Sequence, residues 1–91
     1  MTLTQMQYFS AVCRTLNVTH AAKELHLSQP TLSAAIRAME TECGVELFHH
    51  RANSLALTDE GLVLLEEITP LLKSYDRIPV SYTHLTLPTI R

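Results

Sequence analysis

Residues 21–44 read AAKELHLSQPTLSAAIRAMETECG, and this stretch decides the fold. It contains two helical patterns separated by only a few residues, the first rich in alanine and the second opening at Ser28. Ser28 is a favourable N-cap, Pro30 fits the first turn of a helix, and Gly44 can adopt the left-handed conformation that ends one. Two short helices with so short a connection predict a helix-turn-helix.

The second helix of this motif has two different faces. Its predicted inner line carries apolar residues at the spacing i, i+4, i+7 and i+11: Leu32, Ile36, Met39 and Cys43. The opposite face is polar and built mostly of small side chains: Gln29, Thr31, Ser33, Ala34, Arg37 and Glu40. Such a face suits a helix in the major groove of DNA, where a glutamine can pair with adenine and an arginine can reach guanine or a phosphate.

The sequence also predicts a helix before this motif and the bounds of the motif's first helix. Thr4 and Gln7 have the spacing of a capping box, which predicts a first helix that ends near Asn17. The alanine-rich helix is predicted to begin after the cap Thr19 and to end at His26. The motif is therefore expected to have one additional helix on its N-terminal side.

After the motif, the apolar period changes twice. From Val45 to Leu57 it is an alternation of two residues with a polar tip, which predicts a small hairpin, or wing. Thr58 then caps a long helix in which Pro70 is expected to produce a kink or a break. This helix carries more apolar surface than one small domain covers, so we predict dimerisation through a stripe in near-heptad steps: Leu62, Leu65, Ile68, Leu72 and Tyr75.

The length and composition are those of one small folded domain. The chain has 91 residues, of which 46% are hydrophobic and 18% charged. The expected fold is mainly all-α: a winged helix-turn-helix over residues 1–58 and a linker or dimerisation helix over 59–77. Residues 78–91 follow neither period for long and are expected to be a non-native or disordered tail.

The sequence contains no stretch of the kind that spans a membrane and no signal-peptide pattern at its start, so we expect a cytoplasmic protein with no membrane partner. Cys13 and Cys43 lack CxxC spacing and lie in apolar helical patterns. Both are expected to be free thiols that pack in the core of a protein from a reducing compartment.

The charge balance does not by itself suggest a nucleic-acid partner. The chain has 7 Lys and Arg residues against 9 Asp and Glu residues, whereas DNA-binding domains usually have a basic surface. A winged helix used only for contacts with other proteins is therefore the alternative function. A claim of DNA binding has to rest on the geometry of the polar face.

The sequence resembles the N-terminal domain of LysR-type transcription regulators. The resemblance covers residues 1 to about 77 and is carried, in order and without gaps, by Ala21, Ala22, Leu25, Leu27, Ser28, Gln29, Pro30, Leu32, Ser33, Ile36, Glu40, Gly44, Leu47, Phe48, Leu57, Thr58 and Gly61. It implies a homodimer, or a tetramer of the full-length protein, that binds a pseudo-palindromic operator in double-stranded DNA. It also implies a C-terminal domain, absent from this sequence, that binds a small-molecule effector.

The resemblance also implies which residues contact DNA. They lie at the start of the two motif helices and along the wing: Thr19, Ser28, Gln29, Pro30, Thr31, Ser33, Ala34, Arg37, His50, Arg51 and Asn53. The sequence departs from the family at Ala34, His50, Asn53 and Ala56, where basic residues are usual. We therefore expect few phosphate contacts and a shallow dependence of DNA affinity on salt.

No catalytic, cofactor or metal site is predicted. His49 and His50 would point to opposite faces of a strand and have no third ligand at a suitable spacing. His20 and Glu24 share a helical face, which is more simply a solvated surface than an acid–base pair. The chain has no Gly-rich phosphate loop and no H-E-x-x-H motif, so we expect that it is not an enzyme.

Overall fold

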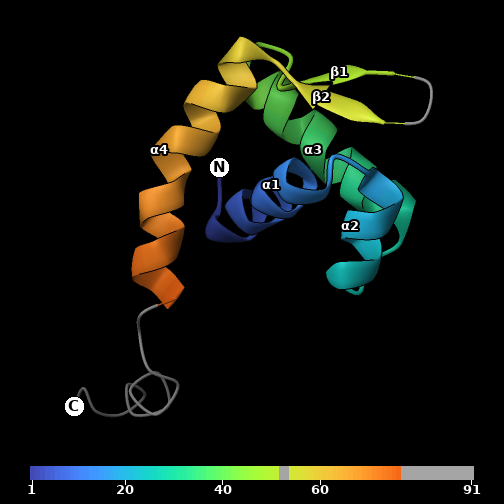
Figure 1. The fold of residues 1–91 in the computed structure, drawn as a ribbon, viewed down its shortest axis with the longest axis horizontal. Helices are drawn as coiled ribbons and strands as arrows, with labels where there is room; N and C mark the ends of the chain where they lie inside the picture. The colour runs from blue at the N-terminus through green and yellow to red at the C-terminus, as the bar shows by residue number, and fades with distance from the viewer. Residues whose placement is uncertain (52–53, 77–91) are drawn as a thin grey trace.

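The structure, a computed structural model, describes residues 1–51 and 54–76. Figure 1 shows the elements that these residues form: α1 (Leu3–Thr15), α2 (Val18–Glu24), α3 (Gln29–Cys43), β1 (Phe48–His50), β2 (Leu55–Leu57) and α4 (Asp59–Asp76). The prediction of a mainly helical winged helix-turn-helix is confirmed. The predicted tail, 78–91, and the predicted DNA contact Asn53 lie outside the described residues.

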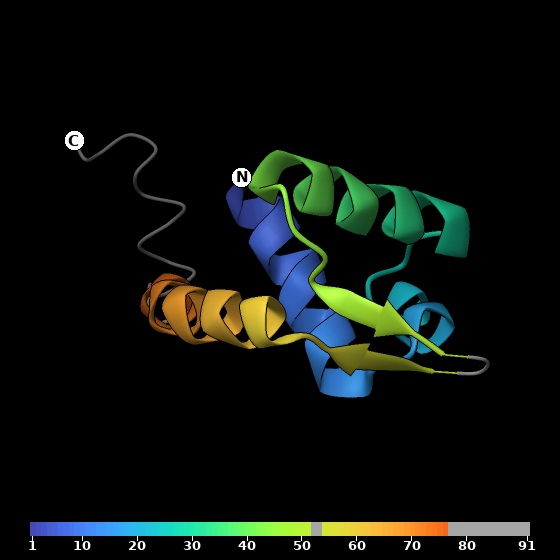
Figure 2. The same ribbon diagram turned by 90° about the horizontal axis from the view of Figure 1, so that it is seen from above.

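Helix α1 is the centre of the domain, because it contacts α2, α3 and α4. Figures 1 and 2 show α4 extending from one side of the domain, while α2 and the hairpin lie on the other side. The largest side chains that are fully buried come from α1, α3 and the start of the hairpin: Phe9, Val12, Leu32, Met39, Leu47 and Phe48. No helix of the described part is long and apolar enough to cross a membrane.

Helix α1 begins two residues earlier than predicted. The capping box is formed by Thr2 and Gln5, and each side chain accepts a hydrogen bond from the other residue's backbone N–H. The predicted pair, Thr4 and Gln7, was wrong although it has the same spacing. The earlier start lets Met1 pack against the core.

Helix α2 also begins earlier than predicted. Its N-cap is Asn17, whose side-chain oxygen accepts a hydrogen bond from the His20 backbone N–H at 2.9 Å. The predicted cap, Thr19, was wrong; it lies inside the first turn. The helix ends at Glu24 instead of His26, because His26 has the left-handed φ of 59°.

Helix α3 has the predicted ends. Ser28 caps it, Pro30 lies in its first turn, and Gly44 closes it with a φ of 74°. Leu32, Ile36 and Met39 are buried as expected, whereas Cys43 is exposed. The prediction for Cys43 was wrong because this residue is the last of the helix, beyond the region that the other elements cover.

The wing is an antiparallel hairpin in which Phe48 pairs with Leu57 and His50 with Leu55. It was predicted from the two-residue alternation, and the structure confirms it. Phe48 is buried, whereas His49 and His50 are exposed, so the strand is anchored at its beginning.

Helix α4 is one continuous helix that passes through Pro70 without a break (Figure 1). The predicted cap is in place, since the Thr58 hydroxyl accepts a hydrogen bond from the Gly61 backbone N–H at 2.9 Å. Ile68 is only 3% exposed and packs against the chain's own core. Its assignment to a dimer surface was therefore wrong, since a helix placed against α1 buries this side chain within the domain.

Candidate nucleic-acid interface

The start of α3 presents a row of exposed polar side chains. Ser28, Gln29, Pro30 and Thr31 are all exposed, and Ser33 is half-buried one turn further along. They are exposed because the buried line of α3 starts at Leu32 and faces the opposite direction. The residues that the sequence predicted as the groove-facing start of the helix thus lie together on one surface.

These polar side chains are hydrogen-bonded to one another. The Ser28 hydroxyl donates to the Thr31 hydroxyl at 2.8 Å, and the Gln29 side-chain amide donates to the Ser33 hydroxyl at 3.0 Å. The bonds hold Gln29 along the helix, with its amide oxygen available as an acceptor. Its amide nitrogen has a second N–H group, so Gln29 can donate to a base while it keeps the bond to Ser33.

Three separate elements meet beside this row in an open, mostly polar depression. It is lined by Asn17 and Thr19 from the start of α2, by Gln29 from α3, and by Arg51 and Ser54 from the wing. Thr19, Gln29 and Arg51 were predicted as DNA contacts although they are far apart in the sequence. Asn17 and Ser54 were missed; the N-cap preference of asparagine is the signal that could have placed Asn17 at this edge.

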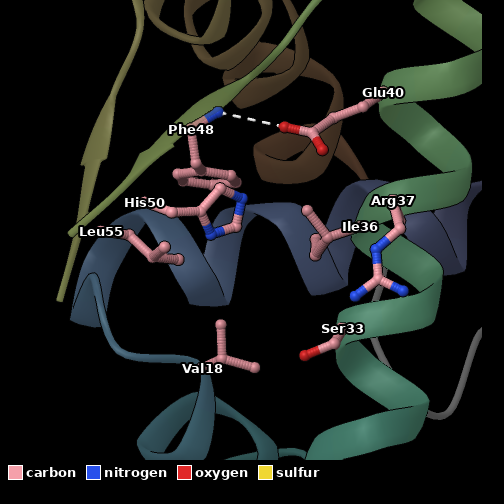
Figure 3. Close-up of a pocket in the computed structure, with 8 residues that line it drawn as sticks. All are labelled: Val18, Ser33, Ile36, Arg37, Glu40, Phe48, His50 and Leu55. Carbon is pink, nitrogen blue, oxygen red and sulfur yellow. Dashed lines mark hydrogen bonds between the residues drawn. The ribbon is translucent and has the colours of Figure 1, made fainter. Parts of the chain in front are cut away.

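The other end of the face contains a small niche between α3 and the wing, which Figure 3 shows. Arg37 and Ser33 line it from α3, and His50 and Leu55 from the wing. Its volume is about 50 Å³, far below the roughly 300–1,000 Å³ of small-molecule sites. The niche lies between α3 and the wing and has the predicted contacts Arg37 and His50 in its lining.

Ala34 is exposed on the same helix and has no polar group to offer. This position is one where the sequence departs from the family, and the structure leaves it facing solvent. The cations of this surface are therefore those of Arg37 and Arg51, both of which are exposed.

The acidic residues of the domain do not cancel these two cations. Glu24 forms an ion pair with Arg14, and Glu42 pairs with the N-terminal ammonium group at 2.8 Å. Within residues 1–51 and 54–76, neither Arg37 nor Arg51 takes part in a salt bridge. Despite the overall negative charge, these two cations are thus exposed and take no part in the ion pairs of the described residues.

Glu40 differs from its predicted position. The sequence placed it on the outer polar face of α3, but the structure turns its carboxylate toward the base of the wing. Its Oε2 atom accepts hydrogen bonds from the backbone N–H groups of Leu47 at 2.8 Å and Phe48 at 3.3 Å. Figure 3 shows the bond from Phe48. The carboxylate is thereby bound by the backbone of the wing, and Glu40 lines the same niche as Arg37.

Among the described residues, no group of three or more His, Cys, Asp or Glu side chains is arranged to hold a metal ion. Burial raises the pKa of the Cys13 thiol from its ordinary 9.0 to about 12. A thiol with so high a pKa stays protonated and unreactive at neutral pH. Cys13 is thus a packing residue and not a nucleophile.

Residues 3–62 match the family model described as bacterial regulatory helix-turn-helix protein, lysR family. Curated relatives include the Hca operon transcriptional activator HcaR of Escherichia coli (strain K12), 41% identical over 80% of this chain and 25% of that protein. Another is the uncharacterized HTH-type transcriptional regulator YybE of Bacillus subtilis (strain 168), 37% identical over 78% of this chain and 24% of that protein. The chain spans about a quarter of the length of the curated relatives it matches.

Solved structures agree with this relationship. The protein in the CbnR_DBD–DNA complex is 35% identical to this chain, with a TM-score of 0.79. The match covers 85% of this chain and 88% of the CbnR_DBD chain. The complex of BenM_DBD with catB site 1 DNA is 31% identical, with a TM-score of 0.81, and covers 100% of this chain and 97% of that chain. The fold, the sequence pattern and the relatives all indicate the same family: the chain belongs to the lysR family of bacterial regulatory helix-turn-helix proteins.

Proposed function

We propose that this chain binds double-stranded DNA with α3 in the major groove, as the DNA-binding part of a LysR-type transcription regulator. The observation that carries the proposal is that Gln29 of α3 and Arg51 of the wing line one open depression. Arg37 is exposed further along α3, and within residues 1–51 and 54–76 neither arginine forms a salt bridge. The CbnR_DBD and BenM_DBD structures are complexes of similar domains with DNA, which supports the same use of the surface here.

The proposed contacts divide into two kinds. Gln29 and Thr31 project from the start of α3, which is the part of a recognition helix that meets base edges. Gln29 has the groups that pair with adenine, and Thr31 has a methyl group that can meet thymine. Arg51 and Thr19 lie at the edge of the open depression, where they are placed to bind phosphates and fix the register of the helix.

We further propose that residues 1–58 form the DNA-binding unit and that α4 joins two such units in a dimer. Four large apolar side chains of α4 are strongly exposed: Leu62 at 47%, Val63 at 55%, Leu71 at 55% and Tyr75 at 48%. Exposed apolar surface of this kind marks an interface with another protein. Of the predicted stripe, Leu62 and Tyr75 are thus available to a partner, whereas Leu65 and Leu72 are half-buried against the core.

The chain spans only about a quarter of the length of these relatives, so the activity of the whole protein is a proposal too. A two-fold dimer places two copies of α3 against a pseudo-palindromic operator. A tetramer, an effector-binding domain and action in the cytoplasm fit the same family but involve no residue described in the structure. The family consists of transcription regulators, so no enzymatic activity is proposed.

The test is selection from a pool of random duplex DNA by the 91-residue chain, with sequencing of the retained duplexes. Arg37→Ala removes a cation from α3, and the matched control Lys73→Ala removes one from the last turn of α4. Enrichment of a two-fold-symmetric site by the parent and by Lys73→Ala, but not by Arg37→Ala, is the expected result. No enrichment by a folded chain would contradict the proposal and point to a protein-contact role.

A further inference from the structure

We propose that Glu40 is a positioning residue: its carboxylate fixes residues 47–48 to the recognition helix, and Thr58 joins the same segment to α4, so that α3, the wing and α4 keep one fixed arrangement on DNA. The inference rests on the proposed DNA binding, which it deepens. It assigns to an acidic residue of α3 a role that requires no contact with DNA.

The Glu40 side chain contacts the backbone at the beginning of β1. A single carboxylate oxygen, Oε2, accepts two hydrogen bonds, from the Leu47 N–H at 2.8 Å and from the Phe48 N–H at 3.3 Å. Leu47 and Phe48 are each 1% exposed, so the backbone that Glu40 holds belongs to the hydrophobic core. Hydrogen bonds to an ionised acceptor are stronger than those between neutral groups. Glu40 therefore holds the beginning of β1 directly against α3.

The backbone of residues 46–47 is also hydrogen-bonded to Thr58, the N-cap of α4. The carbonyl oxygen of Leu47 accepts a hydrogen bond from the Thr58 N–H at 3.1 Å. The Thr58 hydroxyl donates to the Glu46 carbonyl at 2.8 Å. The hydroxyl oxygen of Thr58 also caps α4, because it accepts a hydrogen bond from the Gly61 N–H at 2.9 Å. Thr58 is only 5% exposed. The segment 46–48 is thus fixed by α3 on one side and by the first turn of α4 on the other.

Gly61 shows how closely this joint is packed. A Cβ atom at position 61 would overlap the backbone carbonyl of Leu47 and would lie 2.8 Å from Cδ1 of Leu57. Any larger residue has to push α4 away from the wing. The first turn of α4 therefore has no freedom to move independently of residues 46–48.

The joint matters because the parts it connects have different tasks on DNA. In the proposed complex, α3 reads bases, the wing approaches phosphates, and α4 sets the separation of the two recognition helices. A carboxylate that fixes segment 46–48 to α3 adds no contact with DNA but holds the relative geometry of the three elements. Loss of this carboxylate should reduce selectivity for the correct operator and for its half-site spacing, while binding to arbitrary DNA is retained.

The variants for the test are Glu40→Leu, which removes the acceptor, and Glu40→Gln, which keeps an acceptor oxygen without the charge. Glu46→Gln is the matched control, because it removes an exposed carboxylate six residues away whose residue enters the joint only through its backbone carbonyl. All are made in the 91-residue chain. Each is measured for affinity to the selected operator, to operators with one base pair added or removed between half-sites, and to a random duplex.

For Glu40→Leu we expect a loss of roughly tenfold in operator affinity, the equivalent of one charge-assisted hydrogen bond, with nearly unchanged affinity for the random duplex. Its preference among half-site spacings should flatten. Glu40→Gln should recover most of the operator affinity, and Glu46→Gln should keep both the affinity and the spacing preference. An equal loss on every duplex, or tighter binding to all of them, would overturn the proposal.

A second measurement needs no DNA. Amide hydrogen exchange of Leu47 and Phe48, followed by NMR in the free chain, should be slow in the parent, faster in Glu40→Gln and fastest in Glu40→Leu. Unchanged exchange in Glu40→Leu would overturn the joint itself. If the parent chain selects no operator while exchange responds as expected, the proposed DNA binding fails and the joint between α3 and β1 stands.

Discussion

The rings of Phe9 and Phe48 pack against each other, with centroids 5.3 Å apart and planes inclined at 53°. Phe9 lies in the middle of α1 and is fully buried, and Phe48 opens the first strand of the wing. This tilted arrangement is one that aromatic pairs favour. The base of the wing is thus part of the hydrophobic core and not an appendage of the helices.

We therefore expect Phe48→Ala to lower the free energy of unfolding by about 3–5 kcal/mol, the usual cost of removing a buried aromatic ring. Phe48→Leu, which leaves a smaller void, should cost much less. Urea unfolding followed by circular dichroism measures both. A loss below about 1 kcal/mol for Phe48→Ala would be that of a surface position and would contradict the placement of this ring in the core.

The electrostatic part of DNA binding is predicted to be small. Arg51 lies exposed at the depression between the wing and α2, and few other cations accompany it. Replacing it with alanine should reduce the slope of log affinity against log salt by about 0.9, the contribution of one phosphate contact. Lys73→Ala serves as the control and should leave the slope unchanged. Equal slopes for the parent and Arg51→Ala would show that Arg51 contacts no phosphate.

The two cysteines are predicted to differ sharply in reactivity. Burial raises the pKa of the Cys13 thiol to about 12, whereas Cys43 is exposed. At pH 8, iodoacetamide should modify Cys43 first and Cys13 only after denaturation, because the thiolate is the reactive form. Mass spectrometry of the two peptides measures the rates. Equal rates in the folded chain would contradict the burial of Cys13.

The same shift predicts how stability depends on pH. Below pH 9 the Cys13 thiol is protonated in both the folded and the unfolded chain, so it has no effect. Between pH 9 and about 12 the unfolded chain releases this proton first, and the free energy of unfolding should fall as the pH rises. Urea unfolding at pH 8 and pH 10, with Cys13→Ala as the control, isolates this contribution.

The exposed apolar side chains of α4 should hold two chains together. Leu71→Glu places a charge where Leu71 is 55% exposed and should shift the chain from dimer to monomer in sedimentation experiments. Val45→Glu is the matched control, because Val45 is 39% exposed but lies between α3 and β1. A parent chain that sediments as a monomer, or an equal effect of both variants, would contradict dimerisation through α4.

Helix α3 could be predicted at both ends because every local signal agrees. Ser28 as the cap, Pro30 in the first turn and Gly44 at the end all specify the same boundaries. The start of α1 could not be predicted, because Thr2 with Gln5 and Thr4 with Gln7 offer the same capping box. Which cap α1 uses depends on how this helix packs in the folded domain. The start of α2 was open to prediction, because asparagine is a better N-cap than threonine, which favours Asn17 over Thr19.

The role of Glu40, like the start of α1, was beyond the reach of the sequence because it depends on packing. Helical periodicity places it next to the polar face of α3, and charge alone suggests a solvated side chain. Its partners are backbone amides at 47 and 48, whose position depends on how the wing folds back on α3. Sequence patterns show which side chains are polar, but not which backbone N–H groups will donate hydrogen bonds to them.

The central claim is that the start of α3 reads base pairs, and Gln29 tests it most directly. The measurement is the affinity of the parent, of Gln29→Ala and of the control Gln7→Ala, on α1, for the selected operator and for operators with each base pair changed singly. Gln29→Ala should lose discrimination at one position per half-site by about 1–3 kcal/mol, and Gln7→Ala should match the parent. Identical discrimination by the parent and by Gln29→Ala would contradict base reading by Gln29.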